Sequence, residues 1–406
     1  MTAPRSSELA EKDRGIAAEV AGLAPELKGA KKGQGEPPVP SASERFTAYD
    51  VDAFEIPGGR EENWRFTPMR RLRGLHNGTA AFDGTAAVDV EAGQGVTVEI
   101  VERDDPRIGE GGVPADRVAA AAWSAFSGGT VVTLDGTPAP VTVTVTGPGE
   151  DTVAASHLQL RTTPHTEATV VVVQRGSGTL ADNLEVVVAD GARLTLVVTE
   201  EWADDAVHVG AHHFALGRDA TLRATSVALG GDLVRVSPTI AYRAPGGDAE
   251  LMGLGFADAG QHLEQRLLVD HGEAHCRSRV NYKNALQGDG ARTVWIGDVL
   301  IRNTAEATDT FELNRNLVLT SGARADSVPN LEIETGEIAG AGHASTTGRF
   351  DDEQLFYLQS RGIPEDVARR LVVRGFFGEI LSKITIPELR ERLEAAIEAE
   401  LAASSI

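Results

Sequence analysis

One histidine, His343, stands in the stretch GEIAGAGHASTTGR (residues 336–349) with no large side chain beside it. The glycines around it do not form a dinucleotide-binding turn, because G-x-G-x-x-G starting at Gly340 would require glycine where the chain has Ser345. An imidazole among such small neighbours is either a solvated loop residue or a reactive group displayed at a surface. The stretch itself leaves both interpretations of His343 open.

The segment HVGAHH contains three histidines that could begin a metal site. On a strand, His208 and His212 would lie on one face, and His213 follows directly. No carboxylate or cysteine at a typical ligand spacing completes such a site nearby. We therefore interpret these histidines as core or surface residues rather than metal ligands.

A second group of possible ligands comprises Glu264, His271, Glu273, His275 and Cys276. On a strand, the neighbours His275 and Cys276 would point to opposite faces. We interpret Cys276 as a small apolar structural residue. The chain contains no G-x-x-x-x-G-K-[ST] and no G-x-S-x-G motif, so we do not expect it to hydrolyse nucleotide by itself or to be a serine hydrolase.

Composition excludes several classes of partner. The chain of 406 residues has 60 acidic and 38 basic residues and a net charge of −22, which would repel nucleic acid and anionic membrane surfaces. Its single cysteine excludes an internal disulfide and a four-thiolate cluster supplied by this chain alone. No apolar run is long enough to span a membrane, and the N-terminus lacks the apolar segment of a signal peptide. We therefore expect a cytoplasmic protein.

The chain divides into four regions that differ in amino-acid composition and in hydrophobic pattern. Residues 1–45 are charged and rich in Ala, Gly, Lys and Pro, which predicts a flexible segment. Residues 46–128 predict a small mixed α/β domain with one helix at 114–126. Residues 129–345 are rich in short Val, Thr, Ile and Leu runs such as VTVTVTG and ATVVVVQ, which are typical of strands. Residues 346–406 predict a helical domain.

The strands of residues 129–345 are separated by a recurring turn of a small or acidic residue, alanine, one residue and usually an apolar one. The alanines of this turn are Ala168, Ala192, Ala220, Ala249, Ala274, Ala291, Ala307 and Ala323. Repeated strand-and-turn units without helices predict a solenoid, best a parallel β-helix. The turn alanines at 192, 220, 249, 291 and 323 should then stack near one corner. A sandwich would also use short strands, but it gives no reason for the same turn to recur. The alternative is that such turns are simply common in an Ala-rich chain.

The C-terminal region carries the signals of helices. Asp351 with Gln354 and Thr385 with Glu388 form capping-box patterns, and Pro364 is placed to open a helix. The last helix has an apolar stripe four residues apart, formed by Leu389, Leu393, Ile397 and Leu401. This stripe needs a cover, supplied either by neighbouring helices or by a second protein.

Residues 330–380, NLEIETGEIAGAGHASTTGRFDDEQLFYLQSRGIPEDVARRLVVRGFFGEI, closely resemble the C-terminal signature of the SufB/SufD family of iron–sulfur cluster assembly proteins. The upstream run DTFELNRNLVLTSGARADSVPNLEI is similar to the last β-helix coils of the family, and NWRFTP is similar to its N-terminal motif. The chain looks more like the SufD branch, because SufB members carry several core cysteines.

The resemblance implies a right-handed parallel β-helix between helical termini, in a scaffold subunit that is not an enzyme. It implies pairing with a SufB-type paralogue and binding of a SufC-type ABC ATPase through the C-terminal helical region. Candidate docking residues there are Arg374, Phe376, Phe377 and Ile380.

His343 falls on the histidine that family members place at the interface with SufB, where it is proposed to hold a nascent cluster together with a SufB cysteine. The resemblance thus implies a transient iron–sulfur cluster shared with SufB and no cofactor bound tightly by the chain alone. Many relatives have cysteine two residues before this histidine, where this chain has Ala341. Two other functions stay open: a SufB-like subunit that holds a cluster itself, and a carbohydrate-active β-helix enzyme, against which the sparse aromatic residues and missing export signal argue.

Overall fold

The computed structural model describes residues 44–350 and 352–403. Residues 1–43 of the predicted flexible segment and Asp351, which begins the first capping pattern, lie outside the described residues. Arg45 was wrongly included in the flexible segment, because its guanidinium group is hydrogen-bonded to Asp298 at 3.1 Å and is largely buried. The described residues belong to one compact unit, Ala42–Ile406. No helix among them is both long and apolar enough to cross a membrane.

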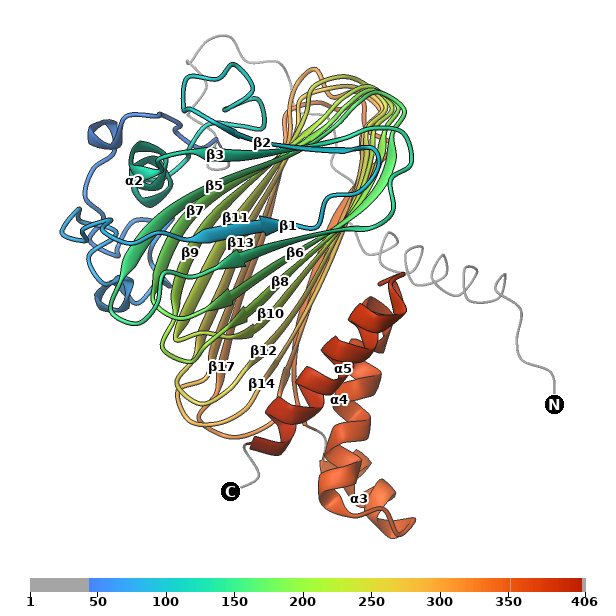
Figure 1. Ribbon diagram of the computed structural model, residues 1–406. Coiled ribbons are helices and arrows are strands. Elements are labelled where there is room, and N and C mark those ends of the chain that lie inside the picture. Colours follow the sequence, from blue (N-terminus) through green and yellow to red (C-terminus); the bar gives the residue numbers. More distant parts are fainter. Residues whose placement is uncertain (1–43, 351, 404–406) are drawn as a thin grey trace. The chain divides into compact units, whose positions relative to one another are not determined.

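Two nine-stranded sheets form most of this unit (Figure 1). Sheet A contains, in spatial order, β1 (Ala87–Val90), β4 (Val141–Thr146), β6 (Glu167–Gly176), β8 (Arg193–Trp202), β10 (Thr221–Gly230), β12 (Asp248–Ala257), β14 (Arg277–Leu286), β16 (Asp309–Val318) and β18 (Gly340–Arg349). Sheet B contains β17 (Arg324–Ile333), β15 (Arg292–Ile301), β13 (His262–His271), β11 (Leu233–Tyr242), β9 (Val207–Leu216), β7 (Thr179–Val188), β5 (Val153–Thr162), β3 (Gly129–Leu134) and β2 (Val96–Val101).

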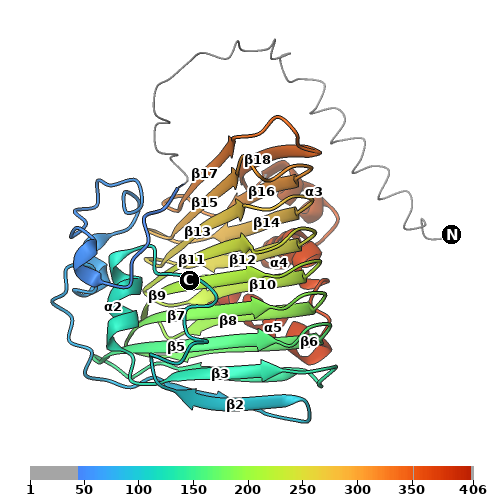
Figure 2. The same ribbon diagram turned by 90° about the horizontal axis from the view of Figure 1, so that it is seen from above.

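From β3 onward the chain alternates between the sheets, so that one strand of each makes a coil. Every strand from β3 to β18 pairs in parallel with the strand two elements away, as β14 does with β16. The result is a solenoid of about eight turns, which confirms the predicted parallel β-helix. Figure 2 shows the coils stacked from β2 and β3 at one end to β17 and β18 at the other.

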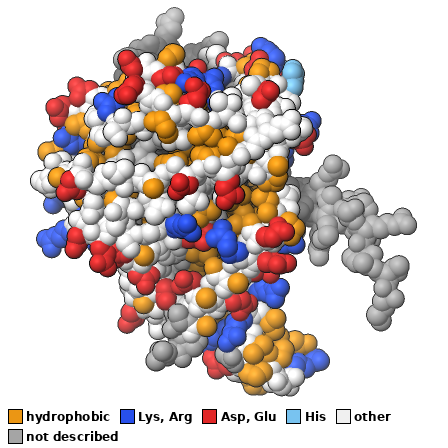
Figure 3. Space-filling view, in the orientation of Figure 1, with side chains coloured by type: hydrophobic (Ala, Val, Ile, Leu, Met, Phe, Trp, Pro, Cys, Tyr) orange, Lys and Arg blue, Asp and Glu red, His pale blue; other side chains and the backbone are white. Residues whose placement is uncertain are grey.

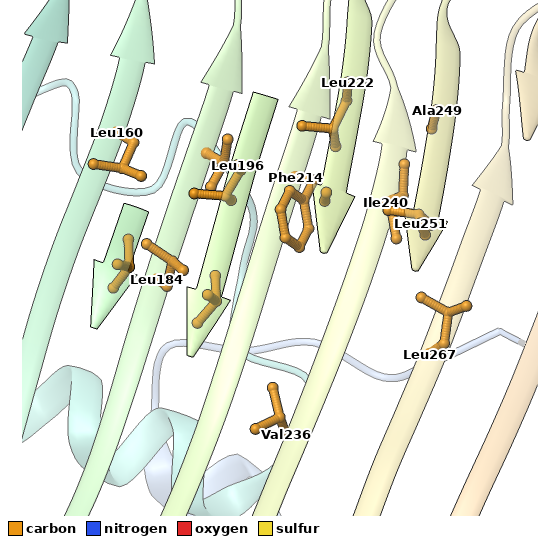
Figure 4. Packing of buried hydrophobic residues seen from close by; sticks show 14 of the residues in the cluster. Leu160, Leu184, Leu196, Phe214, Leu222, Val236, Ile240, Ala249, Leu251 and Leu267 are labelled. Atoms are coloured by element: carbon orange, nitrogen blue, oxygen red, sulfur yellow. The ribbon is translucent and has the colours of Figure 1, made fainter. Parts of the chain in front are cut away.

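Alternation along the strands explains how the solenoid fills its interior. In β4, Val141, Val143 and Val145 are buried, while the threonines between them are half-buried on the outer face. Comparable side chains from the other strands meet between the two sheets (Figure 4). Each large apolar side chain removed from water stabilises the fold by roughly 1.5 to 3 kcal/mol.

The turn alanines do not stack at one corner, so that prediction was wrong. Ala192 and Ala220 directly precede strands of sheet A, and their carbonyls accept hydrogen bonds of 2.8 and 2.9 Å from the following coil. Ala291 and Ala323 directly precede strands of sheet B instead, and Ala249 lies within β12. The turn motif therefore marks half a coil, and equivalent positions recur after a full coil, as Asn284 and Asn316 do 32 residues apart.

The N-terminal region covers the outer face of sheet B. It contains the short 3-10 helices η1 (Val51–Ala53) and η2 (Met69–Leu72) and the helix α2 (Arg117–Ala125), which packs on β5, β7 and β9. Asp116 caps α2 by accepting a hydrogen bond of 2.9 Å from the amide of Ala119, so the helix begins later than predicted. The region also supplies β1 and β2, which pair antiparallel with β4 and β3 at the first end of the solenoid.

The C-terminal region forms α3 (Asp352–Ser360), α4 (Glu365–Leu381) and α5 (Pro387–Ala403). Helices α4 and α5 lie against the outer face of sheet A, and the predicted stripe on α5 is buried there. Lys283 of β14 fixes α4 through its ammonium group, which lies 2.7 Å from a carboxylate oxygen of Glu379. Neighbouring helices and the sheet together provide the cover that the stripe requires.

Candidate functional site

The two ends of the solenoid differ. At the first end, the short antiparallel strands β1 and β2 add to the two sheets and cover the first parallel coil. At the last end, β17 and β18 pair only with β15 and β16, and no other described strand pairs with their outer edges. Inward-facing apolar side chains of this last coil, including Ala325, Leu331 and Ala341, are only half-buried. The last coil therefore presents unpaired backbone groups and part of the solenoid interior.

His343 lies within β18 and not in a loop after the final strand. It is in register with Glu312 of β16, on the row of side chains that faces the solenoid interior in earlier coils. The side chain is exposed, because no described coil follows. No described residue forms a hydrogen bond with the imidazole, which leaves its nitrogens available to a ligand.

The outward-facing positions of β18 carry mostly small side chains. Gly340, Gly342, Ala344 and Gly348 occupy four of them. A Cβ atom at Gly342 would come within 3.2 Å of the Phe311 ring, so a larger residue there would require that ring to shift. A strand of such residues permits close approach of another backbone.

A hydrogen-bonded network of polar side chains supports β18 from below. The Ser345 hydroxyl contacts the Ser327 hydroxyl at 2.7 Å, and Ser327 donates to the Asn314 side-chain oxygen at 2.8 Å. Asn316 donates to the same oxygen at 2.8 Å and to the Thr347 hydroxyl at 3.2 Å. The network joins both strands of the last coil to β16 and fixes the backbone that carries His343.

Glu312, directly beneath His343 in the register, has no such partner. Its side chain is buried, and neither carboxylate oxygen forms a hydrogen bond with any described residue. One of these oxygens lies between the sheets, 2.8 Å from where a Cβ atom on Gly297 would be. Burial, with a smaller contribution from the charge of Asp298, raises the pKa of Glu312 to about 8. The open end thus contains a carboxyl group that is mostly protonated at neutral pH.

The three histidines of HVGAHH are buried, which confirms their interpretation as core residues. Carboxylates do surround His208, but they come from neighbouring coils: Asp182 lies 3.0 Å from its Nε2 and Glu200 lies 2.9 Å from its Nδ1, the latter at an angle outside hydrogen-bond geometry. Burial alone would lower the pKa of His208, but the two carboxylates raise it to about 10. His208 is therefore a buried cation, and sequence spacing could not reveal its partners.

The second predicted group of ligands is dispersed. Glu264 faces outward on β13, whereas His271 faces inward and stacks on Tyr242 with ring centroids 4.8 Å apart. His275 and Cys276 lie in the turn between β13 and β14, not on a strand. Burial raises the pKa of the Cys276 thiol, which packs in the main core. Among residues 44–350 and 352–403, no group of three or more His, Cys, Asp or Glu side chains is arranged to hold a metal ion.

The predicted docking residues on α4 divide into two sets. Phe377 and Ile380 are fully buried against sheet A, so they hold the helix on the solenoid and are not accessible to a partner. Phe376 is half-buried beside Lys283, and Arg374 is exposed with an ion pair to Glu394. The sequence did not single out the exposed apolar residues of this region, which are Phe356, Tyr357, Val367 and Leu371. Figure 3 shows apolar side chains gathered over the α3 end of the helical layer.

These features define a β-solenoid protein whose accessible chemistry lies at an open strand edge and on an outer helical layer, both typical of protein–protein contact. The family model for the SufBD core domain of the SUF system for FeS cluster assembly matches residues 144–376. This chain belongs to the SufB/SufD family of iron–sulfur cluster assembly proteins.

Individual proteins similar to this chain support the same family assignment. An iron-sulfur cluster assembly SufBD family protein of Mycobacterium bovis is 64% identical over 367 residues, which cover 88% of this chain and 92% of that protein. A SufBD family protein of Mycobacterium leprae is 61% identical over 365 residues, 88% of this chain and 93% of that protein. The assembly protein SufD of Escherichia coli is 30% identical over 191 residues, 46% of this chain and 45% of that protein.

Proposed function

We propose that this chain is a SufD-type, non-catalytic scaffold subunit that pairs with a SufB-type paralogue and binds a SufC-type ABC ATPase. The open last coil carries the proposal, because it combines an unpaired strand edge with an exposed histidine. The single cysteine supports the SufD-type assignment over a SufB-like one. Cys276 is buried and its pKa is raised, so it is a poor source of a thiolate ligand.

Pairing through β17 and β18 would use the same backbone hydrogen bonds that join the coils. An added strand on β18 satisfies its free amide and carbonyl groups, and the small outward side chains allow that approach. The imidazole of His343 would then lie at the junction, where it can supply one nitrogen ligand to a nascent cluster whose thiolates come from the partner. The cluster is cargo in this scheme, and Ala341 contributes no ligand to it.

The ATPase is best placed on α3 and α4. The chain lacks a phosphate-binding loop of its own, and the exposed fractions of Phe356, Tyr357 and Leu371 are 71%, 57% and 48%. Exposed apolar side chains of this size on one helical layer are typical of a protein contact. Because α4 and α5 cover apolar residues of sheet A, this docking is tested better by point substitutions than by deletion of the helices.

The cluster role is tested by His343→Ala in the complex purified without oxygen from cells. We expect the complex to assemble and its ATPase activity to persist, while its iron and sulfide contents fall to background. Thr346→Ala is the matched control, since Thr346 is exposed on the opposite face of the same strand. Equal iron and sulfide in the His343→Ala and control complexes would make His343 a solvated edge residue. A cluster retained by the isolated chain would support the SufB-like alternative.

The docking role is tested by Leu371→Asp and Tyr357→Asp. Both should abolish capture of the ATPase while leaving pairing with the paralogue intact. Ile100→Asp serves as the control, because Ile100 is also exposed, at 71%, but lies on β2 at the other end of the solenoid. Unchanged capture by both helical variants would place the ATPase site elsewhere.

A further inference from the structure

We propose that a pocket between the N-terminal region and sheet B binds the carboxylate group of a small organic acid. The proposal concerns the face of the solenoid opposite to the C-terminal helices, so it does not depend on the proposed function. Its basis is a set of buried polar side chains, two of which have a nitrogen without a hydrogen-bond partner among the described residues.

The pocket lies over the outer face of β9, β11 and β13. It is lined by Arg45, Asn63, Ala115, Asp116, Ala119, Ala211, His213, Arg235, Ser237, Thr239 and Arg266. Three arginines thus converge in a chain that has far fewer basic than acidic residues. The cavity volume of about 20 Å³ is room for one or two water-sized atoms, which matches the two oxygen atoms of a carboxylate and is too small for the four of a phosphate.

The motif NWRFTP builds one wall of this pocket. The Trp64 ring lies 3.9 Å from the guanidinium carbon of Arg235, in a cation–π contact. Asn63 accepts from Arg235 through its backbone carbonyl at 3.1 Å and from Arg266 through its side-chain oxygen at 3.3 Å. Thr67 donates to Glu264 at 2.8 Å and anchors the end of the motif. The motif therefore orients two of the three arginines.

The carboxylate of Glu264 already has hydrogen-bond partners other than Arg266. Its oxygens contact the Thr67 hydroxyl at 2.8 Å, Nε2 of His262 at 3.0 Å and Nε of Arg235 at 3.3 Å. Burial opposes its ionisation, but His262 and Arg235 hold its pKa down to about 2. The Nη1 atom of Arg266 lies 3.8 Å from Glu264, too far for a hydrogen bond.

The carboxylates of Asp116 and Asp298 also accept hydrogen bonds already. Asp116 accepts from the first turn of α2 at 2.9 Å and from Arg235 at 3.1 Å. Asp298 accepts from Arg45 at 3.1 Å and from Asn330 at 2.7 Å. Each arginine thus has an acidic neighbour, so the signal for a ligand is an unsatisfied donor and not an excess of positive charge.

Arg266 is that donor. Its side chain is buried, and Nη1 has no hydrogen-bond partner among the described residues. Burial, reinforced by the charges of Arg235 and Arg45, lowers its pKa to about 10, and a bound anion would offset the repulsion among these cations. The free Nη1 can donate a charge-assisted hydrogen bond to a carboxylate oxygen, which is stronger than a hydrogen bond to a neutral water.

His213 of β9, which also lines the pocket, offers a second nitrogen without a hydrogen-bond partner. It is buried, its Nε2 has no hydrogen-bond partner in the described part of the chain, and burial lowers its pKa to about 4. The imidazole is therefore neutral at pH 7 and can donate one hydrogen bond to an anion. The hydroxyl groups of Ser237 and Thr239 line the pocket beside it.

The test uses the full chain and thermal unfolding in acetate or formate, with chloride at equal ionic strength as the reference and phosphate as the size control. We expect the melting temperature to rise and saturate with acetate and formate but not with phosphate. Arg266→Gln should weaken the apparent affinity by about tenfold or more, because a charge-assisted hydrogen bond is removed. Arg65→Gln, at an exposed position of the same motif, should leave it unchanged.

A second pair of variants keeps the test decisive if Arg266→Gln does not fold. Ser237→Asp places a carboxylate in the pocket, so it should raise the melting temperature above that of Ser237→Asn and abolish the response to acetate. The proposal is overturned if Ser237→Asp melts below Ser237→Asn, or if acetate acts no differently from chloride on the wild-type chain. A response to phosphate equal to that to acetate would likewise refute a carboxylate site.

Discussion

Replacing Glu312 by glutamine should stabilise the protein at neutral pH. The carboxyl group has a pKa of about 8 in the folded chain, against an ordinary value of 4.5. Between these values the unfolded chain releases the proton while the folded chain keeps it, so the free energy of unfolding falls as pH rises from 4.5 to 8 and is flat above. Each pH unit corresponds to about 1.4 kcal/mol, so the loss has reached about 3 kcal/mol at pH 7.

Glutamine has nearly the same shape but does not titrate. At pH 4.5 to 5, Glu312→Gln should differ from the wild type by less than about 1 kcal/mol, because the unfolded chain has only begun to release the proton there. At pH 7 the variant should be more stable by about 3 kcal/mol. Any cost of burying the amide is independent of pH, so the slope of the difference isolates the carboxyl group.

Urea denaturation followed by circular dichroism at several pH values measures this difference. Hydrogen exchange of the β16 and β18 amides gives the local counterpart, since a solenoid is stabilised coil by coil. Glu337→Gln is the matched control, because it makes the same chemical change at an exposed position beside the same end of the solenoid. A stability difference for Glu312→Gln that does not change between pH 5 and pH 7 would refute the reasoning.

Three further outcomes follow from buried groups. With pKa values of about 10 and about 3, His208 should still be charged at pH 8 and His271 still neutral at pH 5, as measured by NMR. The His208 ion pairs should stabilise the fold fully below pH 6.5, and this stabilisation should be lost as the pH rises toward 10. Cys276 should react with a thiol reagent only on unfolding, so fast labelling of the native chain would contradict its core position. Phe377→Ala should cost about 3 to 5 kcal/mol of unfolding free energy, whereas Tyr357→Ala should change it by no more than about 0.5 kcal/mol; similar effects would mean that α4 is not packed as described.

The elements with strong local signals could be predicted from the sequence. Runs such as VTVTVT specify a strand with one buried face, and the stripe from Leu389 to Leu401 specifies a helix that must be covered. The β18 strand gave no such signal, because glycine, alanine and serine have little intrinsic preference for strands. Only its register with β16, set by the preceding coils, makes it a strand.

The inward-facing polar side chains of the last coils could not be predicted from the sequence for a related reason. In FELNRN the alternation rule would turn Phe311 and Leu313 inward, but the structure turns Glu312, Asn314 and Asn316 inward instead. The choice depends on what faces these residues across the coil, including Ser327 and Thr347, which are distant in sequence. The charged triad around His208 was equally invisible, because its members lie on three different strands.

The contrast between the two ends argues that the open end is functional. The chain adds the short antiparallel strands β1 and β2 at its first end, which leave edges of only 4 and 6 residues, whereas β17 and β18 are 10 residues each. At the last end it leaves the strand edges unpaired and places an unpartnered carboxyl group beneath an exposed histidine, at a cost of about 3 kcal/mol at pH 7. Proteins leave strand edges unpaired and buried carboxyl groups without hydrogen bonds mainly at functional sites, where a second molecule can supply the missing partners. A partner that pairs with β18 would supply both the missing hydrogen bonds and the missing neighbours of that carboxyl group.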